Sequence, residues 1–240
     1  MKVQVVKDYQ EMSKVAADIV ANVVREKSSP VLGLATGSTP LGLYEILSQF
    51  CRQKKLSFQK VKTVNLDEYV GLGKNDEQSY VHFMHSNLFD KVDLPEENTH
   101  LPNGLASDLQ QECARYHQLL QDYTQDVQIL GLGSNGHIGF NEPNTPFDST
   151  THLVSLADST IKDNARFFKD ISQVPTRAIT MGIAEIMRAK KILVLASGSN
   201  KADAVYKMVK GKVTEQCPAS ILQLHPDCTV LVDEAAASKL

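Results

Sequence analysis

Residues 30–53, PVLGLATGSTPLGLYEILSQFCRQ, contain the two signals that decide the fold. The apolar run at 30–35 predicts a β-strand, and the pattern of 41–53 predicts a helix soon after it. The residues between them, TGST at 36–39, are small or carry a hydroxyl group. Strands that alternate with helices in this way favour a parallel sheet with helices on both sides.

The same alternation runs through the rest of the chain. Further strands are expected over 2–6, 61–66, 127–132, 191–196 and 229–232, and further helices over 8–27, 79–89 and 106–123. The runs at 127–132 and 191–196 are compact and apolar, which is typical of strands buried on both faces of a sheet. No repeat, low-complexity tract or Pro/Ser-rich linker interrupts the pattern, so we expect one α/β domain over residues 1–240.

The composition excludes several classes of function. A formal net charge of −3, with 22% charged residues, gives no electrostatic basis for binding nucleic acid or an anionic membrane. Cys51, Cys113, Cys217 and Cys228 form no CxxC pair, so neither a disulfide framework nor a zinc site is expected. The N-terminus does not resemble a signal peptide and no apolar run is long enough to span a membrane. We expect a cytoplasmic protein without a bound metal.

Two loops after predicted strands have the composition of an anion site. Small residues at 36–39 allow the backbone to approach a ligand, and N–H groups at a helix start bind phosphate. The stretch ASGSNKADAV (196–205) repeats this arrangement, with Lys201 as a point charge, and Arg166 could add another. An ordinary N-cap turn and a solvated lysine are the alternatives for each loop taken alone. Because both loops converge on one sheet edge, together they favour a phosphate site.

The stretch VNLDEYVGL (64–72) places two carboxylates at the carboxyl end of a predicted strand. A carboxylate that faces a cleft from this position can act as a general base. We expect this role for Asp67 or Glu68, and the other carboxylate could point away and cap a helix. A loop that continues through Gly71 and Gly73 makes capping the weaker alternative for the pair.

The stretch ILGLGSNGHIGFNEP (129–143) contains the spacing GxGxxG of a dinucleotide fingerprint. That fingerprint requires a helix to begin within the motif, whereas HIGFNEP reads as an extended or turning loop. The glycines instead allow the backbone to pass close to a ligand. A lone histidine is more often structural, but His137 with Asn135 and Glu142 on one glycine-rich loop indicates a functional site.

The segments ATGSTP, NLDEYVGL, GLGSNGHIGFNEP, DNARFF and SGSNKA, in this order and spacing, resemble the glucosamine-6-phosphate deaminase family. The resemblance covers nearly the whole chain, and HIGFNEP with LDEYVG is its most specific part. It implies a Rossmann-like three-layer αβα fold with a mainly parallel sheet, a lid at about 144–170 and no cofactor. The implied reaction turns glucosamine 6-phosphate and water into fructose 6-phosphate and ammonia.

The resemblance also implies roles for individual residues. Asp67 matches the base that moves a proton between C2 and C1, and His137 matches the group that opens the sugar ring. Glu142 matches its orienting partner, and Asn135 stands where many members carry Asp, so this position lacks the charge that would stabilise an imidazolium. The phosphate-contacting positions match Thr36, Gly37, Ser38, Thr39, Arg166 and Lys201.

One departure concerns regulation. Members activated by N-acetylglucosamine 6-phosphate carry Arg-x-Lys soon after the NEP motif, whereas this chain has His152-Leu153-Val154. We therefore expect no such activation, no regulatory hexamer, and a monomer. A 6-phosphogluconolactonase-type hydrolase and a non-catalytic sugar-phosphate sensor are the alternative functions. The first would not need Asp67 followed by Tyr69-Val-Gly, and the second usually carries a DNA-binding helix-turn-helix.

Overall fold

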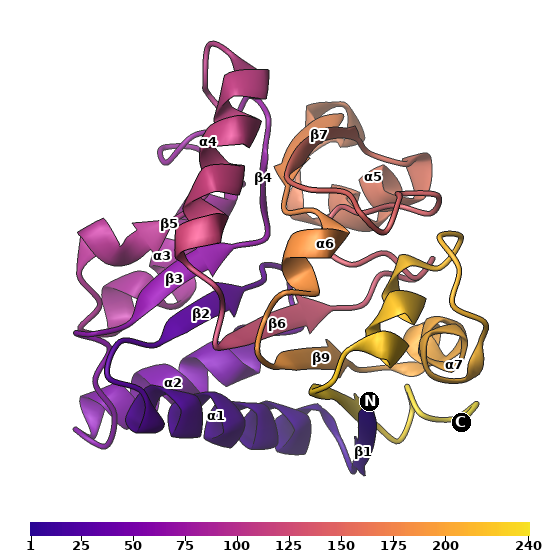
Figure 1. Ribbon diagram of the computed structural model, residues 1–240, viewed down its shortest axis with the longest axis horizontal. Helices are drawn as coiled ribbons and strands as arrows, with labels where there is room; N and C mark the ends of the chain where they lie inside the picture. The colour runs from indigo at the N-terminus through magenta and orange to yellow at the C-terminus, as the bar shows by residue number, and fades with distance from the viewer.

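Seven parallel strands form the main sheet of the computed structural model, in the order β1-β10-β9-β6-β2-β3-β5 (Figure 1). The strands are β1 (Lys2–Val6), β2 (Val31–Leu34), β3 (Lys62–Asn65), β5 (Thr99–His100), β6 (Val127–Gly131), β9 (Ile192–Ala196) and β10 (Cys228–Asp233). The structure describes the backbone of residues 1–240 and all side chains except those of residues 159, 163 and 167. Two side chains of the DNARFF segment therefore lie outside the described residues.

The central strands are buried on both faces, as their apolar sequences predict. Every residue of β2 and β9 is buried, and in β6 only the last residue is partly exposed. Parallel strands reach this state because helices cover both faces of the sheet. In Figure 1, α1 (Tyr9–Glu26) and α2 (Leu41–Arg52) lie along one face, with α4 (Leu109–Asp122) and α6 (Ile183–Ile186) on the other. The fold is therefore the expected three-layer α/β arrangement.

The remaining helices are short and border the loops at the sheet edge. They are α3 (Tyr80–Asn87), α5 (Asp158–Asn164) and α7 (Ala202–Lys210), with 3₁₀ turns η1 (Phe89–Lys91), η2 (Glu96–Asn98), η3 (Ala165–Phe167), η4 (Ile171–Gln173), η5 (Ser199–Lys201) and η6 (Pro218–Leu224). Among the described helices, none is long and apolar enough to cross a membrane. Predicted helix ends agree with the observed ones to within three residues. The largest difference is the start of α4, where the Asp108 carboxylate caps the helix at Gln110 and Gln111.

A second, antiparallel sheet of three strands was not predicted. It has the order β4-β8-β7, with β4 (Asp67–Tyr69), β7 (His152–Ser155) and β8 (Arg177–Thr180). Leu66 links the two sheets. Its N–H donates to the carbonyl of Leu34 in β2, and its carbonyl accepts from the N–H of Met181, which follows β8. Asp67 and Glu68 therefore lie in a short strand, not in the loop that the sequence suggested. Strands of three or four residues give too little alternation to be recognised from sequence.

The chain reverses direction across the main sheet between β2 and β6. From β2 it proceeds through β3 to β5 at one edge, and from β6 through β9 to β10, which lies beside the first strand, β1, at the other edge. The loops that follow β2 and β6 therefore run in opposite directions at the carboxyl ends of these strands and leave a crevice between them. In open α/β sheets this switch point is where ligands bind.

Candidate active site

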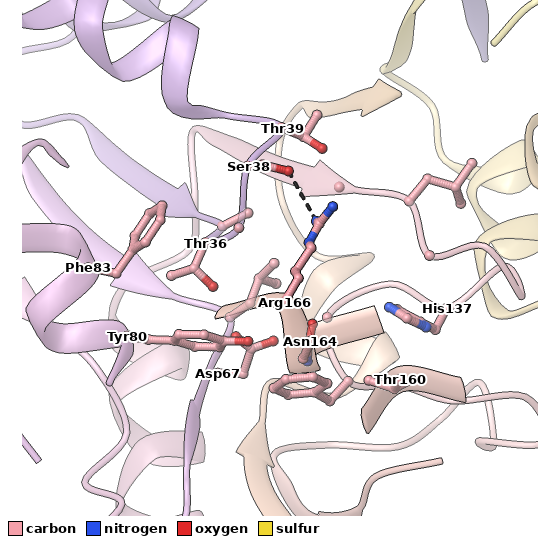
Figure 2. A pocket seen from close by; sticks show the side chains of 18 of the residues that line it. Thr36, Ser38, Thr39, Asp67, Tyr80, Phe83, His137, Thr160, Asn164 and Arg166 are labelled. Carbon is pink, nitrogen blue, oxygen red and sulfur yellow. Dashed lines mark hydrogen bonds between the residues drawn. The ribbon is translucent and has the colours of Figure 1, made fainter. Parts of the chain in front are cut away.

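A cavity of about 740 Å³ opens at the carboxyl ends of β2, β3, β6 and β9, a size suited to a small metabolite. Most of the residues predicted from the sequence line it: Thr36, Gly37, Ser38, Thr39, Asp67, His137, Arg166 and Lys201. Figure 2 shows Ser38 and Thr39 of the β2 loop at one end of the cavity and Thr36 nearer to Tyr80. Asp67 and His137 lie apart from each other on other walls. Asn135 and Glu142 do not line the cavity and contact His137 and its loop from behind.

The loop after β2 is held in place from α1. The Tyr9 hydroxyl donates to the Ser38 carbonyl at 3.2 Å and accepts from the Gly42 N–H at 2.9 Å. Gly37 has a φ of +88°, which favours glycine because a side chain strains this backbone conformation. The residue before α2, Pro40, makes no side-chain cap bond. An ordinary N-cap turn, the alternative for this loop, therefore lacks its defining hydrogen bond.

The loop after β9 is organised by Asp233 at the end of β10. Its carboxylate accepts from the Ser197 hydroxyl at 2.5 Å and from the Gly198 N–H at 3.1 Å. Gly198 has a φ of +94°, and the chain then enters η5 and α7, with Lys201 as the residue before α7. As predicted, Lys201 opens a helix at the cavity wall.

Arg166 reaches the first loop from η3 on the other side of the cavity. Its guanidinium Nη2 donates to the Ser38 hydroxyl at 3.3 Å, as the dashed line in Figure 2 marks. Two cationic side chains and two hydroxyl-bearing loops thus line one cavity, and Arg166 and Ser38 are in direct contact. This set of donors suits a phosphate group, because guanidinium, ammonium and backbone N–H groups all bind its oxygens.

The two adjacent carboxylates of β4 have different environments. Glu68 points away from the cavity and accepts N–H bonds from Tyr69, Tyr80 and Val81 at 2.8–2.9 Å. Tyr80 and Val81 begin α3, so Glu68 caps that helix. Burial raises the pKa of Glu68 to about 7, and the three N–H bonds oppose that shift without cancelling it. Of the two roles that the sequence left open, capping therefore falls to Glu68. Asp67 is the carboxylate that lines the cavity.

Asp67 is a buried carboxylate with little to stabilise its charge. Only 6% of its surface is exposed, and among the described residues no side chain or N–H group bonds its carboxylate. Burial and the neighbouring charge of Glu68 raise the pKa of Asp67 to about 8. A carboxylate in this state is unusually basic, which is the property a proton-abstracting group needs.

The glycines of the 131–139 loop do not have the role that they have in a dinucleotide fingerprint. No helix begins in this loop, in agreement with the sequence interpretation. A Cβ on Gly133 would lie 2.3 Å from Nδ1 of His137, so only glycine leaves room for the imidazole ring. Gly131 has open space beside it and lines the cavity. Of the three glycines in the spacing GxGxxG, Gly133 is thus the one that makes room for His137.

Asn135 fixes which nitrogen of His137 is protonated. Its amide Nδ2 donates to Glu142 Oε2 at 2.9 Å, so its Oδ1 faces His137 and lies 2.7 Å from Nδ1. Because an amide oxygen only accepts hydrogen bonds, Nδ1 carries a hydrogen. Nε2 is then the nitrogen that can exchange a proton with a ligand.

Both carboxylate oxygens of Glu142 accept hydrogen bonds from neighbouring side chains. Oε2 accepts from Asn135 and lies 3.6 Å from His137 Nδ1, while Oε1 accepts from the hydroxyl of Thr160 on α5. Burial alone would raise the pKa of Glu142, but the hydrogen bonds and charge of His137 and the bonds from Thr160 and Asn135 lower it to about 2. Glu142 therefore provides a fixed negative charge behind the imidazole.

Comparison with known proteins identifies the family. Residues 7–231 match the family described as glucosamine-6-phosphate isomerases/6-phosphogluconolactonase. The chain belongs to this family.

Individual relatives of this isomerase/lactonase family match over their full lengths. A protein named glucosamine-6-phosphate deaminase from Clostridium novyi (strain NT) is 54% identical over 241 residues, which is 100% of both chains. One with the same name from Oceanobacillus iheyensis is 53% identical over 98% of this chain and 95% of its own. A solved structure described as a monomeric glucosamine-6-phosphate deaminase is 48% identical, with a TM-score of 0.99 over 100% of both chains. The 6-phosphogluconolactonase of Leishmania guyanensis, 21% identical with a TM-score of 0.79 over 100% of this chain and 98% of its own, shares the fold.

Several residues of this family member's site were missed in the sequence. Thr160 and Asn164 lie on α5, and Asn164 Nδ2 donates to the Tyr69 hydroxyl at 2.8 Å. Tyr80 and Phe83 of α3 line the cavity as well. The only available signal was the position of 160 and 164 within and beside the DNARFF segment. Their partners lie 18 and 95 residues away in sequence, so spacing could not reveal the contacts.

Proposed function

We propose that this protein converts glucosamine 6-phosphate and water to fructose 6-phosphate and ammonia. One observation carries the proposal: a basic carboxylate, an imidazole of fixed tautomer and two anion-type loops line a single cavity. A 2-amino sugar with a remote phosphate requires these three elements. The full-length relatives named for this activity support the same substrate.

Ring opening falls to His137. The pyranose opens when the C1 hydroxyl loses its proton and the ring oxygen gains one, which produces the C1 aldehyde. Nε2 of His137 is the nitrogen available for this transfer, because Nδ1 is bound to Asn135. The fixed charge of Glu142 stabilises the imidazolium that forms when Nε2 takes up the proton.

Proton transfer between C2 and C1 falls to Asp67. The aldehyde acidifies the C2 hydrogen, and the Asp67 carboxylate removes it while the C1 oxygen takes a proton from the C2 ammonium group, which gives an enolamine. Return of the proton to C1 leaves an iminium at C2, to which water adds and from which ammonia departs. The raised pKa of Asp67 makes it a strong enough base for the first step and a good acid for the second.

The phosphate positions the substrate for these steps. We assign its contacts to residues 36–39, Arg166 and Lys201, which all line the cavity, with Arg166 bonded to Ser38. A group held there lies away from C1 and C2 and fixes the sugar so that one carboxylate serves both carbons. This use of remote binding energy explains why the site carries more cationic groups than its chemistry requires.

Ammonia release tests the proposal directly. Purified protein should release one ammonia for each fructose 6-phosphate formed from glucosamine 6-phosphate, and should not hydrolyse 6-phosphogluconolactone at a comparable rate. Lactone hydrolysis without ammonia release would overturn the proposal in favour of a hydrolase. Binding of glucosamine 6-phosphate without turnover would overturn it in favour of a sensor.

We further propose that residues 1–240 form a single catalytic domain that acts in the cytoplasm as a monomer, with 144–170 as a lid. The described monomeric deaminase supports the oligomeric state. Because His152 and Val154 stand at the positions of the basic regulatory pair, N-acetylglucosamine 6-phosphate should leave the rate curve unchanged. A sigmoidal curve that this compound makes hyperbolic would contradict the prediction.

A further inference from the structure

One short segment, residues 158–167 of α5 and η3, contacts three separate parts of the site. Thr160 bonds Glu142 behind the imidazole, Asn164 bonds Tyr69 of β4, and Arg166 bonds Ser38 of the first loop. These partners come from the loop after β6, from the small sheet and from the loop after β2. The short helix α5 and the 3₁₀ turn η3 thus connect the residues assigned to phosphate binding with those assigned to ring opening.

We propose that Thr160 is a positioning residue that holds Glu142 in place and, through α5 and η3, couples its alignment to the phosphate contact of Arg166. The inference rests on the proposed function, since it assigns Glu142 a part in ring opening. Thr160 acts through Glu142 and His137, and its hydroxyl makes no bond to the reacting atoms.

The direction of the Thr160 bond follows from the chemistry of its partner. Glu142 is ionised and can only accept, so the Thr160 hydroxyl donates to Oε1. Thr160 is 3% exposed, so water cannot readily replace the donor if the hydroxyl is removed. Oε2, the oxygen that faces His137 and Asn135, keeps its orientation only while Oε1 is held.

Packing gives this segment the rigidity that coupling requires. Ile161 and Phe168 pack against a small apolar cluster that includes Tyr69 and Phe140, and the Phe168 ring meets Tyr69 edge-on at 6.1 Å. Thr160, Asn164 and Arg166, labelled in Figure 2, all line the cavity from this one segment. A displacement of Arg166 by a bound phosphate would therefore be transmitted to Thr160, six residues back along η3 and α5.

The first experiment compares three variants by the rate of ammonia release. Thr160→Val removes the donor without changing the shape and should lower kcat about 10-fold to 100-fold with KM within about threefold of wild type. Thr160→Ser keeps the donor and should restore most of kcat. Thr145→Val is the matched control, because its hydroxyl also bonds Glu142, but at the backbone carbonyl (2.7 Å), and it should leave kcat within about twofold.

The second experiment is a double-mutant cycle with Arg166→Met, which removes the guanidinium and keeps the stem. If the two positions are coupled, Thr160→Val should lower kcat less than about threefold in the Arg166→Met background. An equal loss in both backgrounds would overturn the coupling. A wild-type kcat for Thr160→Val, or a loss confined to KM, would overturn the positioning role. Wild-type protein that releases no ammonia would instead disprove the proposed function, so the two failures are distinguishable.

Discussion

Asp67 and Glu142 are two buried carboxylates of one site with opposite environments. Asp67 and Glu142 are 6% and 9% exposed, so burial disfavours the charge of both. Glu142 accepts bonds from Asn135 and Thr160 beside an imidazole, and its pKa is lowered to about 2. Asp67 faces the cavity next to another negative charge, and its pKa is raised to about 8. The hydrogen bonds and charge of His137 and the bonds from Thr160 and Asn135 offset burial at Glu142, whereas no such bond offsets it at Asp67.

The difference assigns the two groups to different tasks. A carboxylate that stays charged at any working pH cannot exchange protons, which fits the supporting role that we propose for Glu142. A carboxylate with a pKa near neutrality can accept and return a proton, which is the role that we propose for Asp67. The site thus sets its acid–base roles through neighbouring donors, and each of the following experiments changes one carboxylate or its donors.

The largest expected effect is the loss of the basic carboxylate. Asp67→Asn should lower kcat by about 10³-fold to 10⁴-fold, since the amide cannot accept the C2 proton. Solvent hydrogen exchange at C1 and C2 should disappear together with ammonia release. Phosphate-dependent binding of substrate should persist, because the loops at the other end of the cavity are untouched. A variant that keeps near-wild-type turnover would show that Asp67 is not the base.

A smaller effect is expected for the supporting carboxylate. Glu142→Gln removes the fixed charge and one acceptor, and should lower kcat about 10-fold to 100-fold in the ammonia-release assay. Glu185→Gln is a matched control, because Glu185 is 2% exposed and accepts similar bonds from His117, Thr151 and the Gly182 N–H outside the cavity wall. That variant should lose stability but keep the kcat of its folded fraction. Equal kcat losses in the two variants would argue against a specific role for Glu142.

Stability should respond to the two substitutions with opposite signs. The raised pKa of Asp67 gives a contribution to stability that is fully present below about pH 4 and is lost as pH rises through about 8. Asp67→Asn should therefore be more stable than wild type by at least about 2 kcal/mol at pH 8. The lowered pKa of Glu142 stabilises the fold above about pH 4.5 and is lost only as pH falls through about 2. Glu142→Gln should therefore lose about 2 kcal/mol at both pH 5 and pH 8.

Urea unfolding at pH 5 and pH 8 measures both differences. The gain in Asp67→Asn should grow between these two values, whereas the loss in Glu142→Gln should stay constant. Changes of the same sign in the two variants would show that burial dominates both carboxylates and would remove the basis of the comparison.

The parts of this site that sequence could predict are those governed by strand ends. Residues 192–196 and 31–34 are buried apolar runs, so their position in a parallel sheet followed from composition. Parallel strands bring the residues after them to one edge, and this placed residues 36–39, His137 and Lys201 together in advance. For Asp67 and Glu68 the sequence left two roles open, because which of two adjacent side chains faces inward depends on the small sheet.

The parts that could not be predicted depend on contacts distant in sequence. β4 pairs with β8 more than 100 residues later, and each strand is too short to show a period. Thr160 and Asn164 look like ordinary polar helix residues until α5 is packed against the site. Gly133 is required by the ring of His137, a steric reason that the spacing GxGxxG does not encode.

The smallest effect, and the most discriminating for the network around His137, is expected at Asn135. Asn135→Asp keeps an acceptor for His137 Nδ1 but loses the donor to Glu142 Oε2 and places a second charge beside it. At neutral pH, kcat for ammonia release should fall about 2-fold to 10-fold, which corresponds to one hydrogen bond. Asn135→Ala removes both bonds and frees the imidazole tautomer, so its kcat should be about tenfold lower than that of Asn135→Asp. Equal kcat values for the two variants would mean that the acceptor for Nδ1 is dispensable, and an increase in kcat for Asn135→Asp would mean that charge, not tautomer control, limits ring opening.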